Sequence, residues 1–140
     1  MKTPHPNRLA FRIALYQVAG TSGMEAAFPA ASNNYVRFGR LAGESDIGVS
    51  VTQQRARITL NNRGADAQPA FQNLRAQRES IDAAVGHKLN WDDVDLARQK
   101  TVVRATVDGG YRSDRQGWAD QHCRIIELVR AFQQTFTNRF

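Results

Sequence analysis

Residues 69–91, with the sequence PAFQNLRAQRESIDAAVGHKLNW, decide the fold class of this chain. Apolar side chains recur in this stretch at the three- and four-residue steps that line one face of a helix. They are Phe71, Leu74, Ile81 and Val85. Pro69 suits the first turn of a helix, and Gly86 suits the left-handed position just past its end. The stretch therefore predicts one amphipathic helix, followed by a short return that leads to Trp91.

On both sides of this helix, apolar and polar residues alternate along the chain. The alternating segments are 35–41, 46–52, 56–62 and 100–108. A period of two is typical of strands with one buried face. Gln53 and Gln54 form a link short enough for a tight hairpin, although the usual Gly or Asn is missing. We therefore predict a mostly antiparallel sheet of three to five strands.

Two more helices are predicted near the ends of the chain. A short helix covers residues 8–18. A longer one begins at a capping box formed by Ser113 and Gln116, and an apolar stripe runs through the rest of it. Residues 19–34 are rich in Gly, Ala and Ser and are predicted to form a mobile loop with one helical turn around residues 24–28.

These elements predict a single domain of class α+β. Residues 1–34 supply the N-terminal helix and the loop, and residues 35–140 supply the α+β core. The two long amphipathic helices, which begin near Pro69 and Ser113, cover one face of the antiparallel sheet in a two-layer sandwich. The residues expected to fill the core include Val49, Val51, Ile58, Leu60, Phe71, Leu74, Ile81, Val103, Ile125 and Val129.

Length and composition limit the class of protein. With 140 residues, 41% hydrophobic and 23% charged, the chain has the size and make-up of one globular domain. A single cysteine, Cys123, excludes an internal disulfide and suits a reducing compartment. The N-terminus lacks the apolar core of a signal peptide, and no apolar run approaches the roughly 20 residues that span a bilayer. The sequence thus predicts a cytoplasmic protein with no membrane contact.

The charge of the chain points to its partners. The formal net charge is +6, the isoelectric point is near 10.2, and the lysines are limited to Lys2, Lys88 and Lys100. Arginine therefore supplies most of the positive charge, and its planar guanidinium matches the geometry of phosphate. A basic, arginine-rich domain favours a nucleic-acid partner, DNA or RNA. The competing explanation, a GC-rich genome that encodes arginine in place of lysine, has equal weight.

The polar positions of the predicted strands form a candidate binding face. If Val36 and Phe38 point into the core, the residues that alternate with them point outwards, and Thr52 joins this outer side. The candidates for nucleic-acid contact are Tyr35, Arg37, Arg55, Arg57 and Arg104. An aromatic and several basic side chains on one sheet face are typical of surfaces that bind single strands by stacking and backbone contact. The competing interpretation is a polar face that keeps the sheet soluble.

No pattern in the sequence points to a metal or a cofactor. The acidic run 92–95 lacks the glycine and the glutamate of a cation-binding loop and is predicted to cap a short helical turn. One cysteine and three scattered histidines give no zinc spacing, and His122 is predicted to pack at the edge of the core. A metal-dependent nuclease could use Asp46, but the strand at 55–61 adds neither an acid nor a lysine. We expect no metal and no cofactor, and the question of enzyme activity leans towards none.

Through one set of residues, the chain resembles a known family. The residues that carry the likeness are Phe71, Leu74, Ile81, Asp82, Gly86, Leu89 and Trp91, then Trp118 with Phe132 or Phe136. The chain resembles family 4268 of the bacterial and archaeal domains of unknown function over nearly its whole length. It departs from the family at the front, where Arg12 follows Phe11 in place of a Phe-Trp pair. Members are commonly fused behind restriction-endonuclease-like or other nuclease modules. The resemblance implies a cytoplasmic accessory domain linked to DNA processing or defence, and it implies no catalytic residues.

The leading functional prediction is a non-catalytic binding or accessory domain. Its partner would be nucleic acid, or a nuclease in a bacterial defence, restriction-modification or DNA-processing system. Two alternatives stay open. One is a small metal-dependent nuclease, which needs acidic residues that converge in space. The other is a protein-interaction or inhibitor domain that acts as a homodimer.

Overall fold

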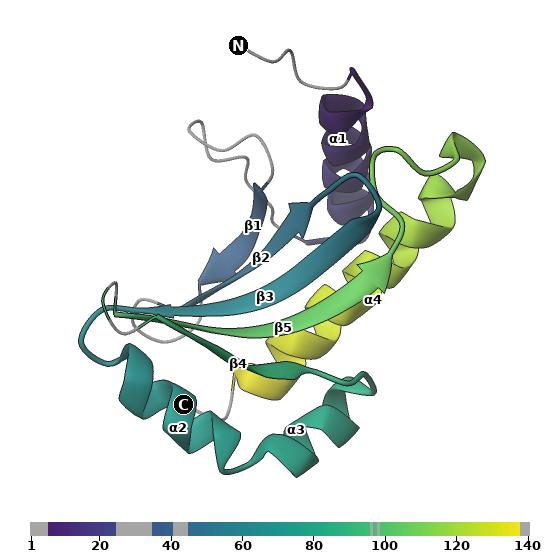
Figure 1. The fold of residues 1–140 in the computed structure, drawn as a ribbon. Helices are drawn as coiled ribbons and strands as arrows, with labels where there is room; N and C mark the ends of the chain where they lie inside the picture. Colours follow the sequence, from purple (N-terminus) through teal and green to yellow (C-terminus); the bar gives the residue numbers. More distant parts are fainter. Residues whose placement is uncertain (1–5, 25–34, 41–44, 96, 98, 138–140) are drawn as a thin grey trace.

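The structure is a computed structural model that describes residues 6–24, 35–40, 45–95, 97 and 99–137. The strands in these residues are β1 (Tyr35–Arg40), β2 (Asp46–Val51), β3 (Arg55–Arg63), β4 (Asn90–Asp95) and β5 (Lys100–Asp108). The helices are α1 (Pro6–Thr21), α2 (Ala67–Arg75), α3 (Arg78–Val85) and α4 (Trp118–Phe136). A single 3-10 turn, Arg115–Gly117, leads into α4. The class is α+β, as predicted (Figure 1).

The strands form one sheet in the order β1-β2-β3-β5-β4, and every neighbouring pair is antiparallel. The four strands predicted from alternation are present, and the predicted hairpin joins β2 to β3. Residues 92–95, predicted to cap a short helical turn, belong instead to β4. Two residues expected in that turn, Leu96 and Arg98, lie outside the described residues. Val94 pairs with Thr101 and Asp95 pairs with Lys100. β4 is an edge strand, where charged side chains are tolerated and discourage pairing with other chains.

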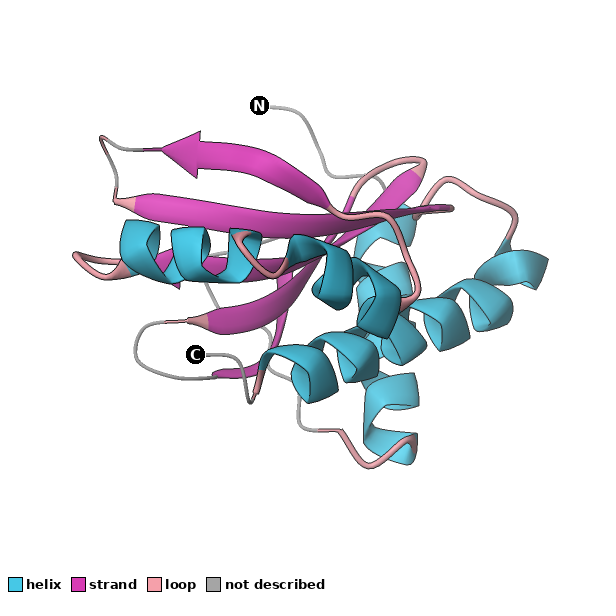
Figure 2. Cartoon of the chain, turned by 90° about the horizontal axis from the view of Figure 1, so that it is seen from below, coloured by secondary structure: helices cyan, strands magenta, loops and turns pink. Residues whose placement is uncertain are grey.

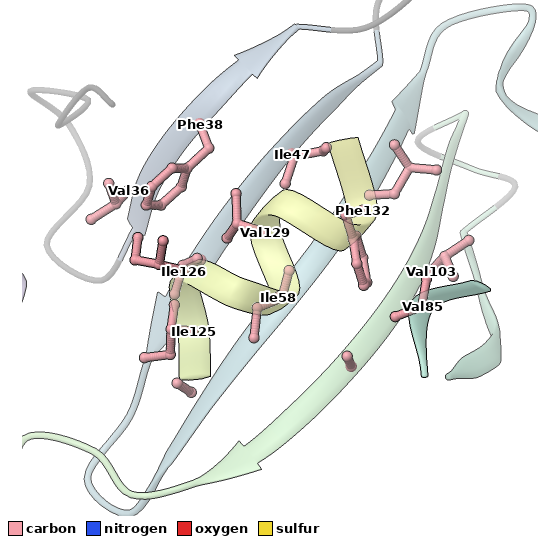
Figure 3. Close-up of a cluster of buried hydrophobic side chains, with 14 of the residues drawn as sticks. Val36, Phe38, Ile47, Ile58, Val85, Val103, Ile125, Ile126, Val129 and Phe132 are labelled. Atoms are coloured by element: carbon pink, nitrogen blue, oxygen red, sulfur yellow. The ribbon is translucent and has the colours of Figure 1, made fainter. Parts of the chain in front are cut away.

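Helices cover the apolar inner face of the sheet, and in the view from below helices lie in front of the strands (Figure 2). All ten residues predicted for the core are buried. α4 lies across the strands, and Figure 3 shows Ile125 and Val129 of this helix close to Ile58 of β3. The predicted two-layer sandwich is thus matched in part, by the burial of one sheet face against the apolar stripe of α4.

The single helix predicted after Pro69 is instead divided into α2 and α3. The backbone N–H of Gln77 donates to the carbonyl oxygen of Leu74 at 2.9 Å, and α3 begins one residue later. The break falls where the apolar stripe has a gap, since no large apolar residue lies between Leu74 and Ile81. α2 contacts β3 and β5, whereas α3 contacts α4. Cover by two long helices therefore holds for α4 and in part for the α2–α3 pair. Gly86 has a φ of 73°, as the predicted left-handed cap requires.

α1 packs on α4 rather than on the sheet. The ring of Phe11 makes edge contacts with Trp118 and His122, with centroids 4.9 and 4.4 Å apart. Both partners are buried, which confirms that they pack in the core. α1 is longer than predicted, so that the first residues of the expected loop at 19–34 are helical. Residues 25–34, which include all but the first residue of the helical turn expected around 24–28, lie outside the described residues.

Residues 109–112 fasten the β2–β3 hairpin to the start of α4. Three of their backbone N–H groups donate to the carbonyl oxygens of residues 52–54, at 2.9 to 3.2 Å. The N–H of Gly110 donates in the other direction, to Oε1 of Gln121 in α4, at 3.1 Å. Gly110 is buried and has a φ of +143°, a backbone conformation that is essentially restricted to glycine.

The capping box predicted at Ser113 is wrong. The carboxylate of Asp114 accepts a hydrogen bond from the backbone N–H of Gln116 at 3.0 Å and so caps the turn that precedes α4. The Ser113 hydroxyl donates instead to the carbonyl oxygen of Gly110 at 2.6 Å. Within the described residues, no helix combines the length and the hydropathy needed to cross a bilayer.

Candidate nucleic-acid interface

The outer face of the sheet is formed by the side chains that alternate with the core residues. Its members include Arg37, Asp46, Ser50, Arg55, Arg57, Thr59, Asn61, Arg63, Arg104 and Thr106. No helix of the described chain lies over this face (Figure 1). The outer face is thus mostly polar and rich in arginine, whereas the inner face is apolar.

Cross-strand register brings the predicted arginines together. One row across the sheet consists of Arg37, Gly48, Thr59 and Arg104. The next row consists of Tyr35, Ser50, Arg57 and Thr106. Arg57 and Arg104 are therefore diagonal neighbours on adjacent strands, a spacing at which long side chains can act on the same ligand. Glycine, serine and threonine occupy the positions beside them, so short side chains lie next to long basic ones.

Asp46 ties together one end of the outer face. Its carboxylate accepts hydrogen bonds from Asn61 Nδ2 at 3.0 Å and from Arg63 Nη1 at 2.7 Å. Arg37 Nε lies 3.6 Å from the same carboxylate. The Asp46 side chain is 5% exposed, and the two arginine side chains are each 38% exposed. This carboxylate therefore offsets part of the charge of two arginines and holds them in place.

The predicted binding residues do not contribute equally. Arg37 is held by Asp46, and Arg55 lies opposite Asp108 at the end of the β3–β5 pair. Arg57 is half-buried in the middle of β3, beside Arg104 of β5. The position of Tyr35 is fixed opposite Ser50, but its side chain lies outside the described part of the structure. The positive charge at the centre of the outer face therefore comes from Arg57 and Arg104.

Two groups of residues were not indicated by sequence reasoning. The first group is Asn61 and Arg63, which surround Asp46. The alternation of β3 continues past residue 60, and this pattern could have placed both residues on the outer face. Arg78, His87 and Lys88 lie beside Arg104 around a pocket at the edge of the sheet. No signal in the sequence joins these residues, because the strand that brings them together, β4, does not alternate.

A family model described as Domain of unknown function (DUF4268) matches residues 16–140. The chain belongs to the DUF4268 family. The likeness that begins at Phe71 and Leu74 is thereby confirmed. The fusion of DUF4268 members to nuclease modules stays a prediction for this chain.

One solved structure has a similar fold to this DUF4268 domain. It is the crystal structure of YbjN from E. coli, a protein proposed to regulate transcription. The TM-score is 0.45 and the sequence identity is 17%, over 88% of this chain and 90% of that chain. A likeness of this size carries no information about function. Among curated proteins, no sequence matches this chain.

The His, Cys, Asp and Glu side chains of this DUF4268 domain are the ones that could hold a metal ion. No three or more His, Cys, Asp or Glu side chains of the described residues gather as a metal site would require. Cys123 is exposed, whereas the neighbouring His122 is buried. The two side chains therefore point to different surroundings, as expected for adjacent positions of a helix.

His122 is the titratable group that the fold perturbs most clearly. Burial lowers its pKa from 6.5 to about 4, and a hydrogen bond to the backbone of Phe11 acts in the opposite direction. Its Nε2 atom is buried and has no hydrogen-bond partner. Since the ring is packed against Phe11 in the α1–α4 contact, we assign His122 to the core of the DUF4268 domain and not to the outer face.

Proposed function

We propose that this DUF4268 domain binds single-stranded nucleic acid on the outer face of its sheet. The observation that carries the proposal is the diagonal Arg57–Arg104 pair in the middle of an antiparallel face that no described helix covers. Arginine at such a position donates to phosphate oxygens without regard to base sequence. The proposal covers DNA and RNA alike, since the face offers no feature that selects the sugar.

The short side chains beside the arginines support a close approach of the strand. Gly48 lies in the same row as Arg37 and Arg104, and a glycine inside a strand often marks a place where another backbone comes near. Ser50 and Thr106 add hydroxyl groups that can donate to phosphate or sugar oxygens. A phosphate backbone could therefore lie along the row while the arginines reach it from both sides.

The first test replaces the central pair. Arg57→Gln with Arg104→Gln should weaken binding to every short single-stranded oligonucleotide alike, because two phosphate contacts are lost. The slope of log affinity against log salt should fall by about 1.4, at about 0.7 per neutralised phosphate on single strands. The measurement is a salt titration by fluorescence anisotropy against labelled DNA and RNA oligonucleotides.

The matched control removes two arginines from the helix side. Arg124 and Arg130 are exposed on α4, and their replacement by glutamine changes the net charge by the same amount. The control should keep the wild-type slope. No binding by the wild type at low salt, or an equal loss of slope in both double variants, would contradict the proposal.

A second test separates binding from nuclease activity at Asp46. Asp46→Asn keeps an oxygen that Asn61 can reach but removes the negative charge from the outer face. We expect affinity for single strands to rise severalfold, because the positive charge of Arg37 and Arg63 is no longer offset by a carboxylate and attracts phosphate more strongly. Stability should fall by about 1 kcal/mol, as partly exposed partners limit the strength of the lost ion pairs.

The nuclease alternative predicts that the same variant loses an activity, DNA or RNA cleavage, instead of gaining affinity. The proteins are incubated with DNA and RNA in the presence of Mg²⁺ or Mn²⁺. Cleavage by the wild type that disappears in Asp46→Asn would assign a catalytic role to this carboxylate and remove the binding-only interpretation.

We also propose that the domain works in a bacterial DNA-processing or defence setting, in the cytoplasm. A nuclease encoded beside the gene, and its co-purification with this domain, would support that setting. The homodimeric interaction domain stays the alternative, and sedimentation of the purified protein tests it.

A further inference from the structure

A basic pocket of about 430 Å³ opens at the edge of the sheet, beside the outer face. Its lining combines Arg78 at the start of α3, residues 87–91, which lead into β4, and Arg104 and Thr106 of β5. The pocket and the outer face share Arg104 and Thr106. A ligand that lies along the face can therefore continue into the pocket.

The pocket exists because β4 is shorter than its neighbour. β4 pairs with β5 from Asn90, opposite Arg104, to Asp95, opposite Lys100. β5 runs on to Asp108, so its last residues extend past the start of β4. His87 fills part of this space, and its Nε2 lies 3.2 Å from the carbonyl oxygen of Thr106.

The chemistry of the lining suits an anion with more than one negative charge. Arg78, Lys88 and Arg104 bring three cationic groups to one pocket, and His87 adds an imidazole. No carboxylate is among the lining residues in the part of the chain that the structure describes. Arginine offers a planar pair of donors to phosphate, and lysine offers a compact charge.

The remaining lining residues fit the part of the ligand that follows the phosphate. Asn90 and Thr106 supply neutral hydrogen-bonding groups, whereas Leu89 and Trp91 form an apolar wall. The indole N–H of Trp91 already donates to Asp82 at 3.1 Å, so its ring is fixed in place. A volume of about 430 Å³ lies within the range of pockets that hold small ligands.

We propose that this pocket binds a phosphate monoester, either at the end of a nucleic-acid strand or in a free nucleotide. A monoester carries a charge of about −1.5 to −2 at neutral pH, whereas each internal phosphodiester carries one. A pocket with three cationic groups on one side of an open edge matches the terminal group better than an internal one. The strand-end form of the proposal rests on the proposed function, and the nucleotide form does not.

The experiment compares oligonucleotides that differ at one end. Labelled ten-residue strands carry a 5′-phosphate, a 3′-phosphate or two hydroxyl ends, and nucleoside monophosphates are compared with nucleosides. For the wild type, one terminal phosphate should tighten binding by about tenfold over hydroxyl ends, as expected for charge-assisted hydrogen bonds. Arg78→Gln with Lys88→Gln should abolish this gain, so that phosphate-ended and hydroxyl-ended strands bind with equal affinity.

Arg57→Gln is the matched control, because it changes the outer face but not the pocket. It should weaken every strand by the same factor and keep the gain from a terminal phosphate. Both pocket residues are exposed, so the double variant should fold, and circular dichroism checks this.

The outcomes distinguish failure of the pocket from failure of the outer face. Hydroxyl-ended strands that bind, with no gain from a phosphate at either end, would overturn the strand-end form alone. Absence of all strand binding would overturn the proposed function. In that case, binding of nucleoside monophosphates but not of nucleosides, lost in the pocket variant, would establish the nucleotide form, and its absence would overturn the pocket proposal altogether.

Discussion

Replacement of Gly110 by alanine should lower the free energy of unfolding by about 2–6 kcal/mol. The first cost is the backbone, because a positive φ of this kind strains any residue with a Cβ by about 1–3 kcal/mol. The second cost is space, since the new Cβ would lie 2.5 Å from the carbonyl oxygen of Thr52 and 2.7 Å from that of Gln53. Moving the hairpin away to relieve such contacts costs about another 1–3 kcal/mol.

Gly20→Ala is the matched control for this prediction. Gly20 lies in α1, and a Cβ placed there meets no atom within 4 Å. Alanine in a helix should instead stabilise the domain by about 0.5–1 kcal/mol. Urea unfolding of the two variants gives both values. Equal effects, or a Gly110→Ala variant as stable as the wild type, would show that residues 109–112 do not hold the hairpin.

Acidification from pH 7 to pH 4 should remove about 3 kcal/mol of stability through His122 alone. The pKa of His122 is about 4 in the folded domain and near 6.5 in the unfolded chain. Above pH 6.5 the ring is neutral in both states, so it has no effect on the free energy of unfolding. Below pH 6.5 the unfolded chain takes up a proton that the folded domain excludes, and stability falls as pH falls. The loss levels off below pH 4, because both states are then protonated.

His122→Gln isolates this contribution. Carboxylates also titrate near pH 4, so the informative quantity is the difference in free energy of unfolding between wild type and variant at each pH. We expect this difference to shrink by about 3 kcal/mol between pH 7 and pH 4. A difference that stays constant over this range would mean that the ring is not buried in the α1–α4 contact.

The sheet was predictable wherever one of its faces is apolar. The alternation of Val49 and Val51, and of Ile58 and Leu60, assigned β2, β3 and the buried side of both strands correctly. β4 was missed because three of its six residues are aspartate and its position comes from pairing with β5. The break between α2 and α3 was missed because the apolar steps on its two sides fit one helix equally well. The helix is divided because α2 packs on the sheet, whereas α3 packs on α4.

The candidate site was predictable in part for the same reason. Alternation alone placed Arg57 and Arg104 on the side opposite the core. Their diagonal placement depends on the register between β3 and β5, which are separated by two helices and a strand in the sequence, and no local pattern encodes it. The role of Asp46 is hidden for a similar reason, because Asn61 and Arg63 approach it from another strand.

The strand order has a consequence for the synthesis of this protein. β5 lies between β3 and β4, although it is the last strand to leave the ribosome. Until residues 100–108 have emerged, β3 presents an unpaired edge, and the apolar face above it still lacks α4. Open edges and exposed apolar faces are the features through which nascent chains aggregate or engage chaperones. The domain should therefore fold late and all at once, and a translational pause before Lys100 should be more harmful than a pause anywhere after Phe136.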